Sequence, residues 1–388
     1  MKLSSTELLS ILVGFDTTSR NSNLELIEWV AGYLADLGVQ ARILHGPDGR
    51  KANLFATIGP LERGGVCLHG HSDVVPVDGQ PWQTDPFRLV ERDGRCFGRG
   101  TSDMKAWLAC GLAAAADYSS KRLLTPIHLA LSYDEEVGCL GAPGLIAPFG
   151  TSVPKPYLVI VGEPSEMAPI TAHKGLLALD SVITGVEAHS SMPHLGVSAL
   201  SAAAEMTVEL QDLAREWLHQ PGPPGMVPSG PTVSVGQLRS GVARNVIPGE
   251  ARLLWEIRFR ATDSPQQLLE QAQQRIESRL RERLAERFSD LTVQTHEVAR
   301  IPAFDAGSDG VAERLVRRLG AVGKARAVPY GAEAGQYAEA GIATVICGPG
   351  SIEQAHRANE FITLSQVHAC DAFLRRLGEL ASEVRLGD

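Results

Sequence analysis

The sequence lacks an apolar stretch long enough to cross a membrane, and it lacks a clear secretory leader. Its N-terminus has a single Lys and a short amphipathic stretch interrupted by Ser10 and Gly14, whereas a signal peptide combines a charged start with an unbroken apolar run. A membrane-spanning helix needs about 20 apolar residues in succession. We therefore expect a protein that has no membrane partner and works in the cytoplasm.

Paired cysteines and clustered basic residues are missing as well. The six Cys are scattered over 388 residues without C-x-x-C spacing, which argues against a disulfide framework and against a thiolate zinc site. The net charge is -9 and no run of Lys and Arg offsets it, so nucleic acid is not expected as a partner. The length allows two domains with a substantial buried core.

What the sequence does contain is an alternation of short apolar segments and helical stretches. The strand candidates are 53–58, 65–70, 126–132, 157–161 and 342–347, and the helix candidates are 5–14, 23–37, 104–118, 308–319 and 364–384. Strands that alternate with helices predict an α/β fold with a mostly parallel sheet.

The pattern changes over residues 177–300. Strand candidates at 177–184, 232–238, 251–259 and 291–298 are combined with long helix candidates at 197–218 and about 264–287. This β-α-β-β-α-β order is typical of a small ferredoxin-like α+β unit. We therefore predict a discontinuous catalytic domain, residues 1–176 and 301–388, with a smaller domain inserted at 177–300.

Acidic residues and His follow the predicted strands. The candidates are His71 and Asp73 after the second strand, Asp134-Glu135-Glu136 after the third, Glu163 after the fourth, His356 beyond the last, and Asp103 just before a helix. In an open α/β sheet these positions share the carboxyl edge, where ligands bind. A His followed two residues later by Asp suits a metal ligand and the carboxylate that orients it.

Each candidate also has an ordinary structural interpretation. Alone, Asp103 would be a helix N-cap, the acids at 134–136 a solvated turn, and Glu163 and His356 turn or loop residues. Their convergence favours a metal site, because several unpaired carboxylates at one place repel one another unless cations lie between them. Two His and three carboxylates suit a pair of zinc-like ions bridged by one acid.

A more specific signal comes from eight segments in order along the chain. They are HGHSDVVPVDGQPWQTDPF (69–87), GRGTSDMK (98–105), LSYDEEVGCLGA (131–142), GEPS (162–165), HKG (173–175), GVEAHSS (185–191), RNVIP (244–248) and CGPGSIEQAHRANEF (347–361). In these segments the chain resembles the M20 metallopeptidase/deacylase family, most of all its acetylornithine deacetylase branch.

The resemblance implies a centre of two divalent metal ions, with zinc preferred and cobalt able to replace it. The ligands of one ion would be His71, Asp103 and Glu163, and those of the other Asp103, Glu136 and His356, so that Asp103 bridges the pair. Glu135 would be the general base, and Asp73 would orient His71.

The resemblance also gives the inserted domain a role in dimerisation or as a lid. His189 would polarise the scissile carbonyl in the partner subunit of a homodimer, although a His in such a turn is otherwise simply bonded to a neighbouring hydroxyl. Asn245 and Arg258 match family positions that contact the substrate carboxylate. Two residues depart from the pattern: Ala106 stands where Gly is usual, and Ala332 stands where a hydroxyl residue is common, which puts one hydrogen bond to the substrate in doubt.

The implied reaction is hydrolysis of a small N-acyl amino acid, with N-acetylornithine giving ornithine and acetate in arginine biosynthesis. Within the family, the alternatives are another N-acyl amino acid deacylase, a succinyl-diaminopimelate desuccinylase and a dipeptidase. The alternative of another class is a catalytically silent ligand-binding relative. Such a relative would lack the base or a ligand, and here every expected position is filled.

Overall fold

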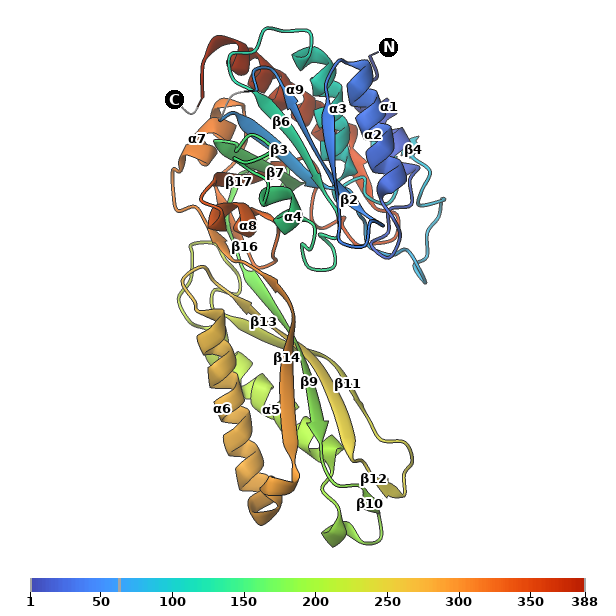
Figure 1. Ribbon diagram of the computed structural model, residues 1–388, viewed down its shortest axis with the longest axis vertical. Coiled ribbons are helices and arrows are strands. Elements are labelled where there is room, and N and C mark those ends of the chain that lie inside the picture. The colour runs from blue at the N-terminus through green and yellow to red at the C-terminus, as the bar shows by residue number, and fades with distance from the viewer. Residues whose placement is uncertain (1, 62–63, 387–388) are drawn as a thin grey trace. The chain divides into compact units, whose positions relative to one another are not determined.

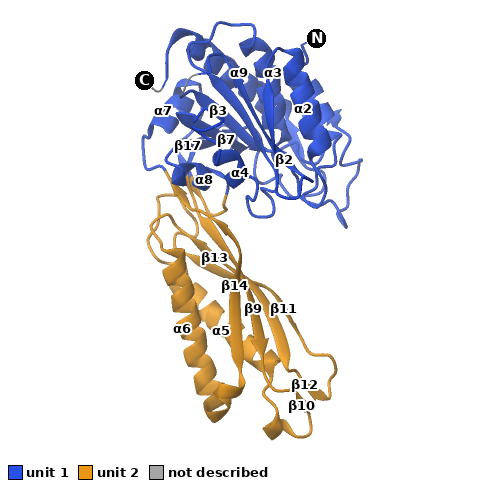
Figure 2. Ribbon diagram, viewed as in Figure 1, with its two compact units in different colours: residues 1–171, 306–326, 332–388 blue, residues 172–305, 327–331 orange. Residues whose placement is uncertain are grey.

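The computed structural model describes residues 2–61 and 64–386, which form two compact units (Figures 1 and 2). Unit 1 consists of Met1–Thr171, Ala306–Arg326 and Ala332–Asp388, and unit 2 of Ala172–Asp305 and Ala327–Gly331. The return of residues 327–331 to unit 2 was not predicted. That the units are independent domains with boundaries at 176/177 and 300/301 stays a prediction.

Unit 1 is built on a mixed sheet whose central strands are parallel. Its strands in unit 1 are β1 (Ala41–His45), β2 (Ala52–Ile58), β3 (Val66–His71), β6 (Ile127–Ser132), β7 (Leu158–Pro164) and β17 (Ala343–Gly348). The same sheet includes β8 (Ile170–His173) and β16 (Arg326–Val328), whose residues are divided between the two units, and β15 (Phe304–Asp305), which belongs to unit 2. Along the order β1-β2-β6-β3-β7-β17-β8-β15, β2 and β8 run against the direction shared by the other strands. The predicted α/β fold with a mostly parallel sheet is therefore confirmed.

The helices of unit 1 cover the sheet on both faces (Figure 1). They are α1 (Ser5–Val13), α2 (Leu24–Asp36), α3 (Lys105–Tyr118), α4 (Ala142–Ile146), α7 (Val311–Arg318), α8 (Ala334–Glu339) and α9 (Leu364–Glu383). Since side chains alternate along a strand, Val66 and Leu68 of β3 enter the apolar core with α3 and α9, whereas His69 faces Tyr337 of α8. Polar side chains at the strand ends can therefore gather on the second face.

Two local features shape the region around the strand ends. A Cβ atom on Gly162 would lie 2.1 Å from the Trp107 ring, so only Gly lets α3 pack this closely against β7. A small sheet of β4 (Val90–Arg92), β5 (Arg95–Phe97) and β18 (Phe361–Thr363) joins the early and late parts of the chain. Hydrophobic periodicity does not reveal this sheet, because each of its strands has only three residues.

Unit 2 has the β-α-β-β-α-β order that the sequence predicts. An antiparallel sheet in the order β11-β13-β9-β14 is covered on one face by two helices (Figure 1). These elements are β9 (Gly175–Thr184), α5 (Ala199–Leu218), β11 (Thr232–Ser240), β13 (Glu250–Phe259), α6 (Pro265–Leu284) and β14 (Thr292–Ile301). Two further short strands, β10 (Ala188–His189) after β9 and β12 (Val246–Ile247) before β13, pair with each other in antiparallel fashion. The side chains of Ser198 and Ser264 cap the two helices, as Ser does at helix starts.

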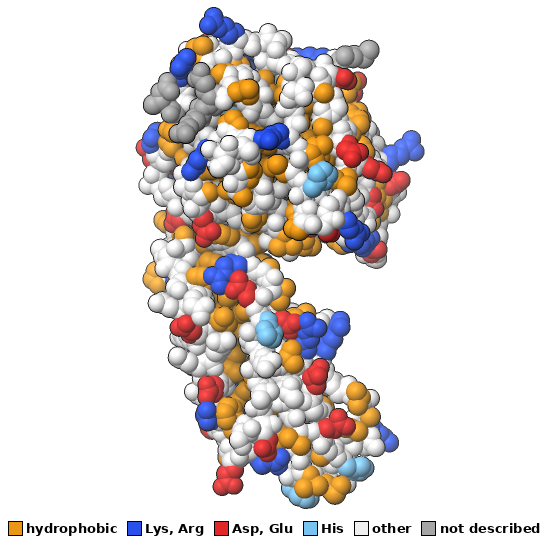
Figure 3. Space-filling view, viewed as in Figure 1, with side chains coloured by type: hydrophobic (Ala, Val, Ile, Leu, Met, Phe, Trp, Pro, Cys, Tyr) orange, Lys and Arg blue, Asp and Glu red, His pale blue; other side chains and the backbone are white. Residues whose placement is uncertain are grey.

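Acidic and basic side chains are interspersed on the face of each unit that Figure 3 shows. In residues 2–61 and 64–386, no helix is both long and apolar enough to cross a membrane.

Candidate metal centre

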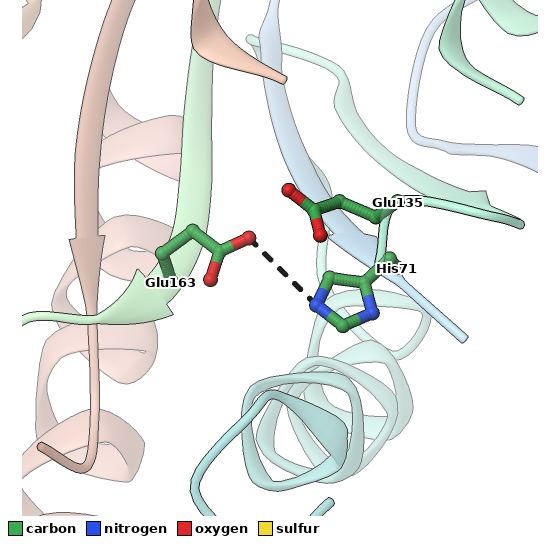
Figure 4. A group of neighbouring side chains, drawn as sticks. All are labelled: His71, Glu135 and Glu163. Carbon is green, nitrogen blue, oxygen red and sulfur yellow. Dashed lines mark ion pairs between the residues drawn. The ribbon is translucent and has the colours of Figure 1, made fainter. Parts of the chain in front are cut away.

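The carboxyl ends of neighbouring parallel strands deliver the first ligand candidates. His71 is the last residue of β3, and Glu163 lies in β7, the strand hydrogen-bonded to it. His71 Nε2 is 3.8 Å from Glu163 Oε1, and both side chains are buried. Figure 4 shows the Glu163 carboxylate pointing towards the His71 ring. The strand-edge argument therefore brings these two residues together as expected.

Asp103 lies between two imidazole rings. Its Oδ1 is 3.1 Å from His71 Nε2 and its Oδ2 is 3.3 Å from His356 Nε2. The N-cap of α3 is Met104, which follows Asp103, and no side chain caps that helix. The alternative interpretation of Asp103 as an N-cap is therefore wrong, and both of its oxygens face the cluster.

His356 joins the cluster from the late part of the chain. Its Nε2 lies 3.0 Å from Glu136 Oε2, and its side chain is about half exposed. His356 and Asp134 have φ angles of 62° and 56°. Non-Gly residues rarely adopt this left-handed conformation, and it is concentrated at functional sites. Both loops that carry site residues therefore hold strained backbone.

Asp73 organises this region through several hydrogen bonds. His71 Nδ1 is 2.9 Å from the Asp73 backbone oxygen and 3.6 Å from its carboxylate. That carbonyl only accepts, so Nδ1 carries the hydrogen and Nε2 is left to face the acids. The Asp73 carboxylate itself accepts hydrogen bonds from the backbone N–H groups of Glu135 and Glu136 and from Ser19 Oγ. It thereby fixes the turn that carries both glutamates.

Glu135, which is partly buried, completes the group in Figure 4. Ligand atoms of His71, Glu135 and Glu163 lie within 4.8 Å of one another, as do those of His71, Asp103 and Glu136. Cys139 Sγ donates to Glu135 Oε1 at 3.5 Å. By position alone Glu135 could serve as a ligand or as a base, so its separate role stays a proposal.

The site strongly favours positive charge. Burial raises the pKa of Glu135 well above its usual range, and the charge of Glu163 adds to the shift. Burial and the neighbouring Asp103 raise the pKa of Glu163 in the same way and that of Glu136 to about 7. Hydrogen bonds to Asp103 and Glu136 raise the pKa of His356 to about 10. Without cations, this centre keeps protons at a pH at which carboxylates and imidazoles have ordinarily released them.

The donor set fits two divalent cations. Oε1 of Glu136 and Oε1 of Glu163 are buried and have no hydrogen-bond partner among the described residues. Buried carboxylate oxygens are normally satisfied, and a metal ion is a standard partner. Oxygen and imidazole nitrogen without sulfur suit zinc and similar ions. These orphaned oxygens support the metal hypothesis independently of the sequence motifs.

The other site candidates lie in unit 2. His189 in β10 is exposed, and its Nδ1 is 2.7 Å from Ser191 Oγ, which matches the ordinary interpretation of this His. Asn245 is exposed, and its backbone oxygen accepts a hydrogen bond from Ser190. Arg258 in β13 is half-buried, and its Nε is 2.9 Å from Glu256 Oε1. Their roles towards a substrate stay predictions.

Two buried glutamates near the centre were not recognised from the sequence. Glu333 is fully buried, paired with His69 and 2.8 Å from Ser132 Oγ. In the sequence, the only pointer to it is that it directly follows Ala332, a position where the chain departs from the family pattern. Glu360 lies inside the motif segment 347–361, in which only His356 was predicted to be a site residue. Its carboxylate accepts hydrogen bonds from the turn that carries Asp103.

The sequence is similar to those of known proteins over most of its length. Residues 67–379 match the sequence profile of peptidase family M20/M25/M40. The chain is 34% identical to an acetylornithine deacetylase of Myxococcus xanthus over 379 residues, which cover 95% of each protein.

Two solved structures show that the fold is shared at low sequence identity. A tripeptidase from Staphylococcus aureus gives a TM-score of 0.76 at 19% identity and covers 99% of each chain. A dinuclear metal binding peptidase from Bacillus subtilis gives 0.67 at 17% identity and covers 98% of each chain.

The expected resemblance is therefore confirmed by a profile that spans most of the chain and by a relative matched over nearly its full length. The acids gathered at the strand ends lie within the matched residues. The chain belongs to peptidase family M20/M25/M40, a family of hydrolases.

Proposed function

We propose that the protein is a metal-dependent amidohydrolase that converts N-acetylornithine and water into ornithine and acetate. The observation that carries this proposal is the cluster of His71, Asp103, Glu136, Glu163 and His356 with its orphaned buried oxygens. The 34% identity to a full-length acetylornithine deacetylase supports the choice of substrate.

The metal centre would be held by ligands from unit 1. His71, Asp103 and Glu163 would hold one ion and Asp103, Glu136 and His356 the other, with zinc as the expected metal and cobalt as a substitute. When bound, such ions make water more acidic and polarise a carbonyl oxygen. The pair of His rings facing opposite oxygens of Asp103 supports its role as the bridging acid.

The protein's own residues would supply the proton transfers. We assign Glu135 as the base that takes the proton from the attacking water and passes it to the leaving nitrogen. Asp73 fixes the Glu135 backbone N–H at 3.1 Å, which holds the side chain at the cluster.

Unit 2 would complete the site through an assembly of two chains. We propose that His189 stabilises the oxyanion in the partner subunit of a homodimer, and that Asn245 and Arg258 bind the substrate carboxylate. His189 is exposed on a short strand, and within residues 2–61 and 64–386 its ring is hydrogen-bonded through Nδ1, which supports a contact of Nε2 with a partner chain. The six buried thiols support work in a reducing compartment such as the cytoplasm.

Kinetic comparison of substrates tests this function. With added zinc or cobalt, we expect N-acetylornithine to give the highest kcat/KM among N-acetylornithine, N-acetylmethionine, N-succinyl-diaminopimelate and dipeptides. Release of ornithine and acetate in equal amounts identifies the bond cleaved. A higher kcat/KM for the succinyl substrate or for a dipeptide would contradict the substrate assignment but retain the amidohydrolase.

Subunit complementation tests the role of His189. Neither Glu135→Ala nor His189→Ala should be appreciably active alone, because each removes one part of every site. After full subunit exchange the mixture should recover about a quarter of wild-type activity, since half of the dimers are mixed and each has one intact site. Co-expression followed by ultracentrifugation and assay provides the measurement. Verified mixed dimers without activity would mean that His189 does not act in the partner's site.

A further inference from the structure

The turn before α3 wraps around one buried carboxylate. Glu360 Oε1 accepts hydrogen bonds from the backbone N–H groups of Ser102 at 2.8 Å and Asp103 at 3.0 Å. Its Oε2 accepts from Gly100 N at 3.0 Å and from Arg99 Nη1 at 2.8 Å. Glu360 is 1% exposed. Successive N–H groups around one anion fix the backbone of a turn.

Glu360 also belongs to the segment that carries His356. Its backbone oxygen accepts from Gly98 N at 3.0 Å, and the next residues form β18, which pairs with β5. Ser102 Oγ adds a bond to the Ser351 backbone oxygen at 3.0 Å. The loop that carries Asp103 and the loop that carries His356 are therefore joined largely through Glu360.

A buried Arg–Glu pair can simply stabilise a fold, so the position of the other donors is decisive. One of them is the backbone N–H of Asp103 itself. The two oxygens of Asp103 lie 3.1 Å from His71 and 3.3 Å from His356, so a small rotation of this peptide would displace both contacts. Metal sites tolerate shifts of only about 0.5 Å in their ligands.

We propose that Glu360 is a positioning residue for the metal centre: it sets Asp103 and His356 in the arrangement that binds two cations. It touches neither cation nor substrate. This inference rests on the proposed function, because it concerns the affinity of the centre that function requires. Residues that hold metal ligands in place typically contribute about 10–100-fold to metal affinity.

Metal titration of a Glu360→Gln variant tests the inference. The amide keeps one oxygen but places an NH₂ donor against N–H groups of the turn, so that the turn loses its fixed geometry. We expect zinc affinity, measured by competition with a chromophoric chelator, to fall about 10–100-fold. At saturating zinc, kcat should return to within a few-fold of wild type.

Tyr118→Phe is the matched control for general stability. Tyr118 Oη donates to the Leu374 backbone oxygen at 2.5 Å, a buried bond that joins α3 to α9 without touching the turn. This variant should lower Tm and leave zinc affinity unchanged. If Glu360→Gln binds zinc as tightly as wild type, the inference is overturned. The proposed metal centre still stands in that case, because the wild-type protein binds zinc.

A second variant covers the case in which Glu360→Gln does not fold. Glu360→Asp keeps the charge for Arg99 but is one methylene too short to reach all four donors, so its zinc affinity should also fall, by less. Unchanged affinity in this variant would overturn the inference. A wild-type protein that binds no zinc would overturn both the inference and the proposed function.

Discussion

Replacement of Glu135 by Gln is expected to lower kcat by about 10²–10⁴-fold, the range that general acid–base catalysis supplies. Gln keeps the size of the side chain and removes the group that moves the proton. The metal content should stay at two ions per chain, and KM should change little, because substrate binding is not altered. Glu136→Gln, the matched neighbour, should lose one ion because Glu136 Oε2 faces His356 at 3.0 Å.

Elemental analysis and steady-state kinetics on both variants give the decisive comparison. Glu135 lies as close to His71 and Glu163 as a metal ligand would. Only the two variants together therefore distinguish a base from a ligand. Loss of metal in Glu135→Gln, with both ions retained in Glu136→Gln, would exchange the two assignments. The hydrolase would remain, with a different base.

Removal of the metal should abolish activity, and added zinc or cobalt should restore it. A metal that binds the folded chain stabilises it by about 2.7 kcal/mol when its concentration is about 100 times Kd. Chelated protein should therefore also unfold at a lower Tm. Activity assays and calorimetry on dialysed and reloaded samples measure the two effects together.

The stability of the metal-free protein should depend on pH in a defined direction. Burial raises the pKa of Glu136 from 4.5 to about 7, so the folded state favours the protonated carboxyl. This contribution is complete below pH 4.5 and is lost as the pH rises through about 7. The Tm difference between loaded and metal-free protein should accordingly widen over that interval. Full turnover by protein shown to be metal-free would end the proposal of a metal centre.

The strand ends explain why much of the centre could be predicted from sequence. Short apolar runs indicated β3, β6 and β7, and parallel strands present their carboxyl ends at one edge. This placed His71 and Glu163 together before any distance was known. The same argument included Asp103 and His356 as candidates, but only the resemblance assigned them as ligands, because they lie on loops whose paths hydrophobic periodicity does not describe.

The burial of Glu333 and Glu360 and their distant partners could not be predicted from the neighbouring sequence. A Glu in a polar segment is usually exposed, and nothing beside either residue in the sequence indicates its partner. Glu360 meets its donors roughly 260 residues away, and Glu333 is paired with His69. Such partnerships depend on the tertiary fold. The β4-β5-β18 sheet adds a second obstacle to the shortness of its strands, since β18 pairs with β5, which lies far earlier in the sequence.

The division of unit 1 into separate pieces has a consequence for how the protein is made. Glu163 leaves the ribosome roughly 190 residues ahead of His356, about 10–40 s earlier at about 5–20 residues per second. During that delay the nascent chain holds only part of its ligand set. The intervening segment ends where it began, since Ala172 pairs with Asp305 in β8 and β15 and Ala306 N bonds Thr171 O at 2.8 Å. Folding of unit 2 as it emerges would therefore hold the early ligands next to the growing end, and it would shorten the loop that His356 must close.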